Sequence, residues 1–313
     1  MNILFRADSS STIGTGHIMR DLVLSKKYAK KGHNIIFATQ NLDGNINHKI
    51  EEAGYKIEIL KSDTIKQLDK LIKKFKIDKL VIDHYDIDYK FEKKLKENNP
   101  NLKILSFDDT YLKHHCDIVL NHNISGDKKK YKGLVPKNCK VKCGAKYTLL
   151  REEFYKEKKK LKKKNILSTI NHQPFTIFIA MGGADTANLN IKILKILKKY
   201  KNIKVNLVTT LANKNLEKLK NYCKNRSWIN LDINSNKIAK LMAKSDFAIV
   251  TPSVTVNEVY FMEVPFIAIK TAENQNDVYE YLKKKKYAVL AEFDEKKIIK
   301  MIKKNSNCLM ELY

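Results

Sequence analysis

The sequence predicts an α/β protein with two doubly wound, Rossmann-like domains that face a cleft. Short apolar segments, typical of buried parallel strands, alternate with longer segments whose apolar residues recur every three or four positions, typical of helices. This pattern runs through residues 1–155 and restarts at Phe175 with another strand, glycine turn and helix. Strand–helix alternation predicts parallel sheets covered by helices, and 313 residues are enough for two such domains.

The first half is expected to form six strands with helices between them. Gly54 ends one of these helices and Pro100 stops another, because glycine and proline interrupt helical backbone. The expected strands cover residues 2–5, 34–39, 56–60, 79–83, 103–107 and 116–121. The expected helices begin at His17, cover residues 45–53, run from a cap at Ser62 to Phe75, and cover residues 90–97.

A linker is expected at residues 156–174, because the lysine-rich run at 156–165 buries little apolar surface. The second domain then comprises residues 175–313. Its expected strands cover residues 175–181, 204–209, 228–232, 246–250 and 265–269. Its expected helices include residues 187–198, a helix that starts after Ser253, and residues 294–304, which either close the second domain or cross back to the first.

The chain is strongly basic, with 61 Lys and Arg against 34 Asp and Glu and a net charge of +27. Such a charge raises the hypothesis of nucleic-acid binding. The lysines are, however, spread along nearly every expected helix, and arginine is scarce. This distribution indicates solvated helix faces, so we expect no nucleic-acid partner, although the positive field should attract a small anionic substrate.

We expect a cytoplasmic monomer. Arg6 and Asp8 interrupt the first apolar run, which excludes a signal peptide by pattern, and no apolar stretch reaches membrane-spanning length, so no membrane insertion is expected. The five scattered cysteines are consistent with reduced thiols. Cys139 and Cys143 lie near three histidines in sequence, but their spacing matches no zinc pattern. We therefore expect no metal and no other cofactor.

The loop after the first strand has the composition of an anion site. A strand, the turn Gly14-Thr-Gly16 and a helix start direct backbone N–H groups outward. His17 adds a base that titrates near neutrality. The third glycine of a dinucleotide loop and the Gly-Lys-Ser/Thr ending of a triphosphate loop are both missing. On local grounds, a structural turn with a capping histidine is an equally good interpretation.

Polar side chains follow three expected strands of the first half. His17 follows the first strand, Asp83 and Tyr85 lie at the end of another, and Asp108 follows the next. Each alone is most often a cap or a satisfied core group. Because the carboxyl ends of parallel strands meet at one edge of a sheet, together they predict a polar cleft.

The second half has a similar pattern after its strand at 246–250. Ser253 is expected to cap the following helix, with Thr255 in its first turn, and free N–H groups there suit a diphosphate. Glu258 lies about one turn further on, where a carboxylate can accept from a ribose diol. A capped helix with an acid that favours its own dipole is the alternative interpretation.

These residues carry a resemblance to a known family. The stretch from Phe5 to Asp21 resembles the N-terminal motif of the UDP-2,4-diacetamido-2,4,6-trideoxy-β-L-altropyranose hydrolases of pseudaminic acid biosynthesis. The resemblance extends from Met1 to about Tyr287. Further matching segments are residues 82–85, 104–109, 114–117, 131–136, 150–154, 181–185, 256–258 and 274–275.

A more distant resemblance concerns the nucleotide-binding segment of the lipid-II-forming N-acetylglucosaminyltransferase, which residues 253–258 and 264–266 resemble. It implies a fold of the GT-B type, with a UDP-sugar bound between the domains. One departure is Pro252, where related hydrolases carry small Ser or Ala residues. This change could reshape the phosphate turn without removing its donors.

The resemblance implies hydrolysis of the sugar–phosphate bond, with release of UDP and the free sugar, in pseudaminic acid biosynthesis and flagellin glycosylation. A retaining mechanism would need a carboxylate nucleophile, whereas the motif supplies a histidine. His17 is therefore expected to activate a water that attacks C1 with inversion. N–H groups at Gly16 to Ile18 and around Ser253 to Thr255 would hold the charge of the leaving UDP.

The remaining substrate contacts are assigned on the same basis. Glu258 is expected to bind the ribose and Asn257 the diphosphate side, while Asp83, Tyr85 and Gln275 are expected near the sugar or the water. Asp8 and Arg151 are further expected contacts. The full expected set is Asp8, Gly14, Gly16, Ile18, Asp83, Tyr85, Arg151, Gly183, Ser253, Thr255, Asn257, Glu258 and Gln275.

Two other functions stay open. A UDP-sugar glycosyltransferase of the same fold would use an acceptor hydroxyl in place of water. A non-catalytic binder of a UDP-sugar or of nucleic acid would not depend on His17.

Overall fold

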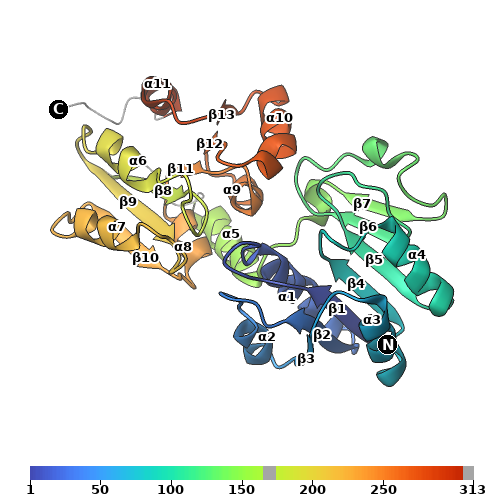
Figure 1. Cartoon of the computed structure of the whole chain (residues 1–313). Coiled ribbons are helices and arrows are strands. Elements are labelled where there is room, and N and C mark those ends of the chain that lie inside the picture. The colour runs from blue at the N-terminus through green and yellow to red at the C-terminus, as the bar shows by residue number, and fades with distance from the viewer. Residues whose placement is uncertain (165–173, 306–313) are drawn as a thin grey trace. The chain divides into compact units, whose positions relative to one another are not determined.

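The computed structural model describes residues 1–164 and 174–305 (Figure 1). The chain forms two compact units, Met1–Leu150 and Arg151–Tyr313, and each is built around one parallel β-sheet with seven and six strands, respectively. The predicted α/β class with two parallel, helix-covered sheets is confirmed. Within the described residues, no helix is both long and apolar enough to span a membrane.

The sheet of the first unit has the strand order β3-β2-β1-β4-β5-β6-β7. The order reverses beside β1, which pairs with both β2 and β4. The strands are β1 (Asn2–Ala7), β2 (Asn34–Gln40), β3 (Lys56–Leu60), β4 (Lys79–Asp83), β5 (Lys103–Phe107), β6 (Ile118–Asn121) and β7 (Lys140–Cys143). The helices are α1 (Gly16–Ala29), α2 (His48–Glu52), α3 (Ile65–Lys74) and α4 (Tyr89–Asn98), with 3₁₀ turns at Lys128–Tyr131 and Ala145–Tyr147.

Side chains alternate along each strand, so they point to both faces of this sheet, and both faces are buried. In β1, Leu4 lies in a core cluster on one face, and Ile3 and Phe5 lie in the cluster on the other. Phe5 stacks on Phe37 of β2 with ring centroids 5.0 Å apart. The near-continuous apolar strands that the sequence shows are therefore a consequence of helices covering both faces.

Two local predictions in this unit differ from the structure. The cap of α3 is Thr64, whose side chain accepts from the backbone N of Gln67 at 3.4 Å, whereas Ser62 accepts from the side-chain amide of Gln67 at 2.6 Å. Strand β7 was not expected. It lies at the sheet edge beside β6, and its alternating lysines gave it too little apolar character to be recognised.

The sheet of the second unit has the order β10-β9-β8-β11-β12-β13, and the order reverses beside β8. The strands are β8 (Phe175–Ala180), β9 (Ile203–Thr209), β10 (Ile229–Ile233), β11 (Phe247–Val250), β12 (Phe266–Ile269) and β13 (Ala288–Leu290). The helices are α5 (Glu152–Lys164), α6 (Asn190–Leu197), α7 (Leu216–Cys223), α8 (Ile238–Ala243), α9 (Val254–Met262), α10 (Asn276–Lys284) and α11 (Glu295–Asn305), with a 3₁₀ turn at Glu273–Gln275.

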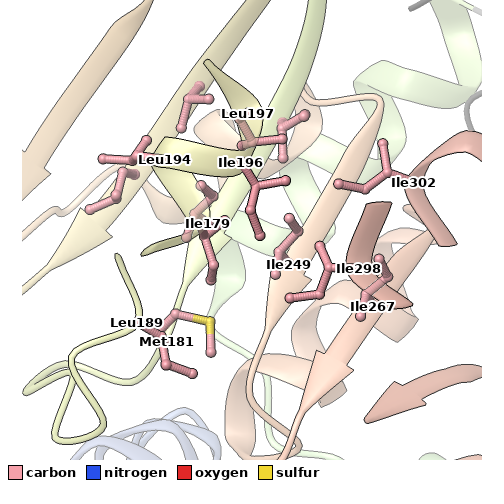
Figure 2. Packing of buried hydrophobic residues seen from close by; sticks show 14 of the residues in the cluster. Ile179, Met181, Leu189, Leu194, Ile196, Leu197, Ile249, Ile267, Ile298 and Ile302 are labelled. Atoms are coloured by element: carbon pink, nitrogen blue, oxygen red, sulfur yellow. The ribbon is translucent and has the colours of Figure 1, made fainter. Parts of the chain in front are cut away.

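The core of this unit includes the last described helix. Figure 2 shows Ile249 of β11 and Ile267 of β12 beside Ile298 and Ile302 of α11. Ile298 and Ile302 are fully or almost fully buried in this cluster. Helix α11 therefore closes the second unit, which decides between the two alternatives that the sequence left open.

The predicted linker at residues 156–174 needs correction over its first part. Residues 156–164 belong to α5, and this helix is part of the second unit. Lys158, whose side chain is only 16% exposed, donates to the backbone oxygen of Phe261 and pairs with Glu263 at 2.7 Å, both at the end of α9. Lysine favours helix and packs its aliphatic stem, so a lysine run need not be a linker. Residues 165–173 lie outside the described part of the chain.

Candidate active site

The loop after β1 forms the tight turn that its glycines predict. The backbone N of Gly14 donates to the oxygen of Ser10 at 2.9 Å, and Gly14 has a φ of +83°, which favours glycine. Helix α1 then begins at Gly16, and Thr15 makes no side-chain cap hydrogen bond. The first N–H groups of a helix have no intrahelical partner, so those of Gly16 to Ile18 are available to an anion. The side chain of Ile18 itself is buried in the core.

His17 is oriented by the end of β4. Its Nδ1 lies 3.0 Å from the backbone oxygen of Asp83, and its ring contacts the edge of Tyr85 with centroids 5.0 Å apart. A carbonyl oxygen only accepts, so Nδ1 carries the proton and the neutral ring keeps its lone pair on Nε2. The predicted proximity of His17, Asp83 and Tyr85 is therefore confirmed, and the three lie at the point where the strand order reverses.

The carboxylate of Asp83 pairs with Arg20, and its expected contact with the sugar or the water stays a prediction. Arg20 Nε donates to Oδ2 at 2.5 Å, and Nη2 donates to Oδ1. Burial by itself would raise the pKa of Asp83, but the positive charge and hydrogen bonds of Arg20 outweigh it and lower that pKa. The side chain of Asp83 thus forms an ion pair with Arg20, and the backbone oxygen of Asp83 accepts from His17.

Arg20 also reaches two residues that the sequence did not single out. Its Nη1 lies 3.3 Å from Oδ2 of Asp109 and 3.3 Å from Nε2 of His122. Burial, together with the charge of Arg20, lowers the pKa of His122 to about 3, so this ring is neutral and accepts from Arg20. The hydroxyl of Tyr85 donates to Asp109 at 3.2 Å. Asp109, rather than the expected Asp108, therefore joins the site.

Asp8 lies in a separate buried cluster. Arg6 donates to both of its oxygens, the backbone N of Gln40 donates to it at 2.7 Å, and Nε2 of His84 lies 3.2 Å away. These partners lower the pKa of Asp8 against the effect of burial, which would raise it. Asp8 is only 1% exposed, so the structure places it in support of the strand ends and not at an open surface.

This cluster also contains the one potential metal-ligand group of the described residues. Asp8, Asp63 and His84 bring one ligand atom each within 4.8 Å of one another. Arg6, however, already pairs with both carboxylates. A guanidinium in this position supplies the positive charge that a cation would bring, so the residues do not fit a metal ion.

In the second unit, the turn after β8 has a structural explanation. The backbone oxygen of Gly183 accepts from the hydroxyls of Thr209 at 2.9 Å and Thr210 at 3.0 Å. A Cβ at Gly183 would lie 2.9 Å from Cγ2 of Thr210, so a larger residue would require the Thr210 side chain to shift. Asp185 accepts from the backbone N of Leu189 at 2.8 Å and so supports the start of α6. A substrate contact of Gly183 stays a prediction.

The N-terminus of α9 lies at the corresponding reversal point, directly after β11. Ser253 is its N-cap with extended backbone, but its hydroxyl is 3.0 Å from that of Thr251 and makes no cap hydrogen bond. The first-turn N–H groups, including that of Thr255, therefore have no side-chain cap and can bind an anion. Asn257, one turn into the helix, is buried.

Glu258 and Arg151 form a pair in this unit. Nη2 of Arg151 lies 3.4 Å from Oε1 of Glu258, and Nη1 lies 2.8 Å from Glu153. Burial raises the pKa of Glu258 to about 7, although Arg151 opposes this shift. Gln275 does not join this pair: its Oε1 accepts from the backbone N of Thr271 at 2.8 Å and shapes the turn before α10.

The residues that sequence reasoning missed had a usable signal. Arg20 lies three positions after His17 and therefore on the same face of α1. Asp109 and His122 follow the ends of β5 and β6, where polar groups gather in a parallel sheet. Their pairing depends on which strand ends become neighbours, so it could not be read from the sequence alone.

Known proteins resemble this chain over most of its length. No protein-family model matches the sequence. The chain is 42% identical over 289 residues to the UDP-2,4-diacetamido-2,4,6-trideoxy-β-L-altropyranose hydrolase of Campylobacter jejuni, which covers 92% of this chain and 98% of that protein. It is 32% identical over 291 residues to the uncharacterized protein MJ1062 of Methanocaldococcus jannaschii, covering 91% of this chain and 59% of that protein.

Solved structures support the fold. The chain is similar to MurG of Acinetobacter baumannii with a TM-score of 0.65 and 12% identity, over 97% of this chain and 90% of that one. It is similar to the spinosyn rhamnosyltransferase SpnG with a TM-score of 0.66 and 11% identity, over 98% and 92% of the two chains. At such low identity these likenesses show the fold alone, which is that of the GT-B glycosyltransferases, as expected.

Proposed function

The chain belongs to the family of UDP-2,4-diacetamido-2,4,6-trideoxy-β-L-altropyranose hydrolases, and from this premise we propose that it cleaves the sugar–phosphate bond of that UDP-sugar. The products are UDP and the free diacetamido-trideoxy sugar, an intermediate of pseudaminic acid biosynthesis and thus of flagellin glycosylation. The identity spans nearly the full length of the Campylobacter jejuni relative, so both units of the chain take part in the comparison.

The observation that carries the mechanism is the contact between His17 and Asp83. Because Nδ1 of His17 donates to the backbone oxygen of Asp83, Nε2 is the atom that accepts a proton. Nε2 takes a proton from water, the water oxygen bonds to C1 of the sugar, and the C1–O bond breaks with its electron pair leaving on UDP. The carboxylate beside this ring, Asp83, and the carboxylate of Asp109 are both paired with Arg20, which supports attack by water with inversion over a covalent intermediate.

The second unit supplies the groups that bind UDP in this proposal. The first-turn N–H groups of α9, with Ser253 and Thr255, hold the diphosphate, and Asn257 lies on the diphosphate side. Glu258 accepts from the ribose hydroxyls. The helix N-terminus and the net charge of +27 supply the positive potential for the leaving group, so the mechanism includes no metal ion.

The remaining contacts are proposed on the same basis. Tyr85 packs against the sugar beside His17, Gly14 and Gly16 bring the backbone close to the substrate, and Gln275 and Arg151 complete the set. We further propose that the enzyme is a cytoplasmic monomer. Its described cysteines are free thiols, which supports a reducing compartment, and light scattering of the purified protein tests the monomer.

The decisive experiment measures UDP release from the purified protein and UDP-2,4-diacetamido-2,4,6-trideoxy-β-L-altropyranose, with EDTA present and no acceptor. Release that depends on His17 is expected. NMR of the first product anomer, before mutarotation, is expected to show inversion, and initial retention would contradict the water mechanism.

A UDP-sugar glycosyltransferase is the second candidate, because the solved structures with this fold include transferases such as SpnG. Tight binding of the UDP-sugar without release would favour this candidate. Absence of binding would contradict both functions.

A further inference from the structure

The guanidinium of Arg20 joins the ends of three neighbouring strands. It binds Asp83 at the end of β4, Asp109 after β5 and His122 after β6. Its carbon also lies 4.9 Å from the centroid of the Phe107 ring. The side chain of Arg20 is only 7% exposed, so this cation sits within the structure and not at the surface.

Two of these partners control His17. Asp83 carries the backbone oxygen that accepts from Nδ1 of His17, and its side chain is held by Arg20 through two hydrogen bonds. Asp109 accepts from the hydroxyl of Tyr85, whose ring packs edge-on against His17. A single cation therefore contacts both Asp83, whose backbone oxygen accepts from the His17 ring, and Asp109, which accepts from Tyr85.

We propose that Arg20 is a positioning residue of the hydrolase: by binding Asp83, Asp109 and His122, it holds His17 and Tyr85 in the arrangement that turnover requires. The inference rests on the proposed role of His17 as the base. Arg20 lies three residues after His17 on α1, so helix geometry sets the spacing between the base and its support.

An arginine is needed here because one planar group must serve several acceptors at once. Two of its nitrogens donate to the carboxylate of Asp83, and a third lies within reach of both Asp109 and His122. A lysine has one nitrogen and cannot reproduce this fork. Loss of the fork would loosen the end of β4, and a misplacement of about 1 Å at a catalytic group can cost roughly 100-fold in rate.

The charges around His17 predict the direction in which the pH dependence of turnover should change in each variant. Asp83 and Tyr85 face His17 from β4, Arg20 from its own helix, and His122 from the end of β6. Burial raises the pKa of Asp21, which also lies near Asp83, and so favours its neutral form. The negative charge of Asp83 and the positive charge of Arg20 therefore oppose each other beside His17.

The first test compares Arg20→Lys with the matched control Arg226→Lys, which changes a half-buried arginine of the second unit. For Arg20→Lys we expect kcat for UDP release to fall roughly 10- to 100-fold with KM changed less than about threefold. The control should stay within about twofold of the parent enzyme. An unchanged kcat in Arg20→Lys, or a loss fully explained by unfolded protein, would overturn the proposal.

The second test uses Arg20→Gln, Asp83→Asn and the double variant. Without Arg20, the uncompensated Asp83 favours the protonated imidazole, so the acidic limb of the pH–rate profile should move up by about 0.5–1 pH unit. Asp83→Asn should move it down by a similar amount. The double variant contains no buried unpaired charge, so it keeps the test valid if a single variant does not fold. It should restore the position of the acidic limb, while kcat stays low.

A third readout does not depend on turnover. NMR of ¹⁵N-labelled histidine rings, with the His17 signals assigned through His17→Gln, is expected to show the Nδ1–H form in the parent protein and a mixture of both neutral forms in Arg20→Lys. Absence of UDP release from the parent protein would remove the proposed function, whereas this NMR result would still decide whether Arg20 positions His17. Identical spectra in both proteins would overturn the inference.

Discussion

Nδ1 of His17 lies 3.0 Å from the backbone oxygen of Asp83, 66 residues further along the chain. The contact connects the helix after β1 with the end of β4, the two strands between which the order of the sheet reverses. It also decides which ring nitrogen of His17 is available for chemistry. The proposed base is thus oriented by backbone, which no side-chain substitution at Asp83 removes directly.

His17→Ala is expected to lower kcat for UDP release by roughly 100-fold or more, because it removes the group that takes the proton from water. UDP affinity, measured by calorimetry, should be unchanged, since the backbone N–H groups at Gly16 to Ile18 remain and the other expected UDP contacts lie in the second unit. The matched control is His48→Ala, which changes an exposed histidine. Near-normal turnover in His17→Ala would remove the assignment of the base.

Glu258→Ala is expected to weaken UDP binding, because the ribose loses its carboxylate acceptor. Calorimetry should show a loss of roughly 10-fold or more, the effect of one hydrogen bond to a charged group. Glu280→Ala, which changes an exposed glutamate of the same unit, serves as the control. Equal affinity in the parent protein and Glu258→Ala would show that the ribose assignment is wrong.

The same residue should make the stability of the second unit depend on pH. Burial raises the pKa of Glu258 from 4.5 to about 7, so the folded state holds its proton more tightly than the unfolded state. This contribution to stability is complete below about pH 4.5 and is lost as the pH rises to about 7. Glu258→Gln should remove a loss of about 3 kcal/mol over this interval.

Fluorescence of Trp228, the single tryptophan, reports unfolding of the second unit and can follow this difference in urea. Parallel pH curves for the parent protein and Glu258→Gln would contradict the raised pKa.

His114 should make the stability of the first unit depend on pH in the alkaline range. Burial would lower the pKa of His114, but the carboxylates of Asp108 and Glu92 outweigh it and raise the pKa to about 9. Nδ1 of His114 lies 2.8 Å from Glu92. This stabilisation is complete below about pH 6.5 and is lost as the pH rises through about 9.

Amide hydrogen exchange of β5 and β6 between pH 6.5 and 9, corrected for the intrinsic rate, measures this effect. The opening free energy should fall with rising pH in the parent protein and stay nearly flat in His114→Gln. The exposed His48→Gln serves as the matched control. The same slope in the parent protein and His114→Gln would refute the prediction.

Lys158→Ala tests whether α5 is part of the second unit. Lys158 donates to the backbone oxygen of Phe261 and pairs with Glu263 at the end of α9, so its loss should destabilise this unit by about 1 kcal/mol. Lys160→Ala, which removes only an exposed pair with Glu157, should cost less than about 0.5 kcal/mol. If Lys158→Ala and Lys160→Ala gave equal unfolding curves by Trp228 fluorescence, residues 156–164 would behave as a linker and not as part of the second unit.

The sequence by itself determined the fold class and the location of the two candidate sites. Apolar segments with strand and helix periods depend on neighbours within a few residues, so they predict the elements directly. Because parallel strands end at one edge of a sheet, it also predicted that His17, Asp83 and Tyr85 meet. Its errors were local: the lysines hid β7 and made residues 156–164, the later part of α5, resemble a linker.

Only the tertiary structure decided the partner of each buried charge. Asp83 and Asp8 were both expected as substrate contacts, and each forms an ion pair with an arginine. Arg20 and Asp109 lie beside His17 and Tyr85, although the sequence did not single them out. A buried carboxylate needs a compensating cation, and this cation comes from whichever element the folded sheet brings beside it. That choice depends on the order of the strands, which local sequence patterns do not contain.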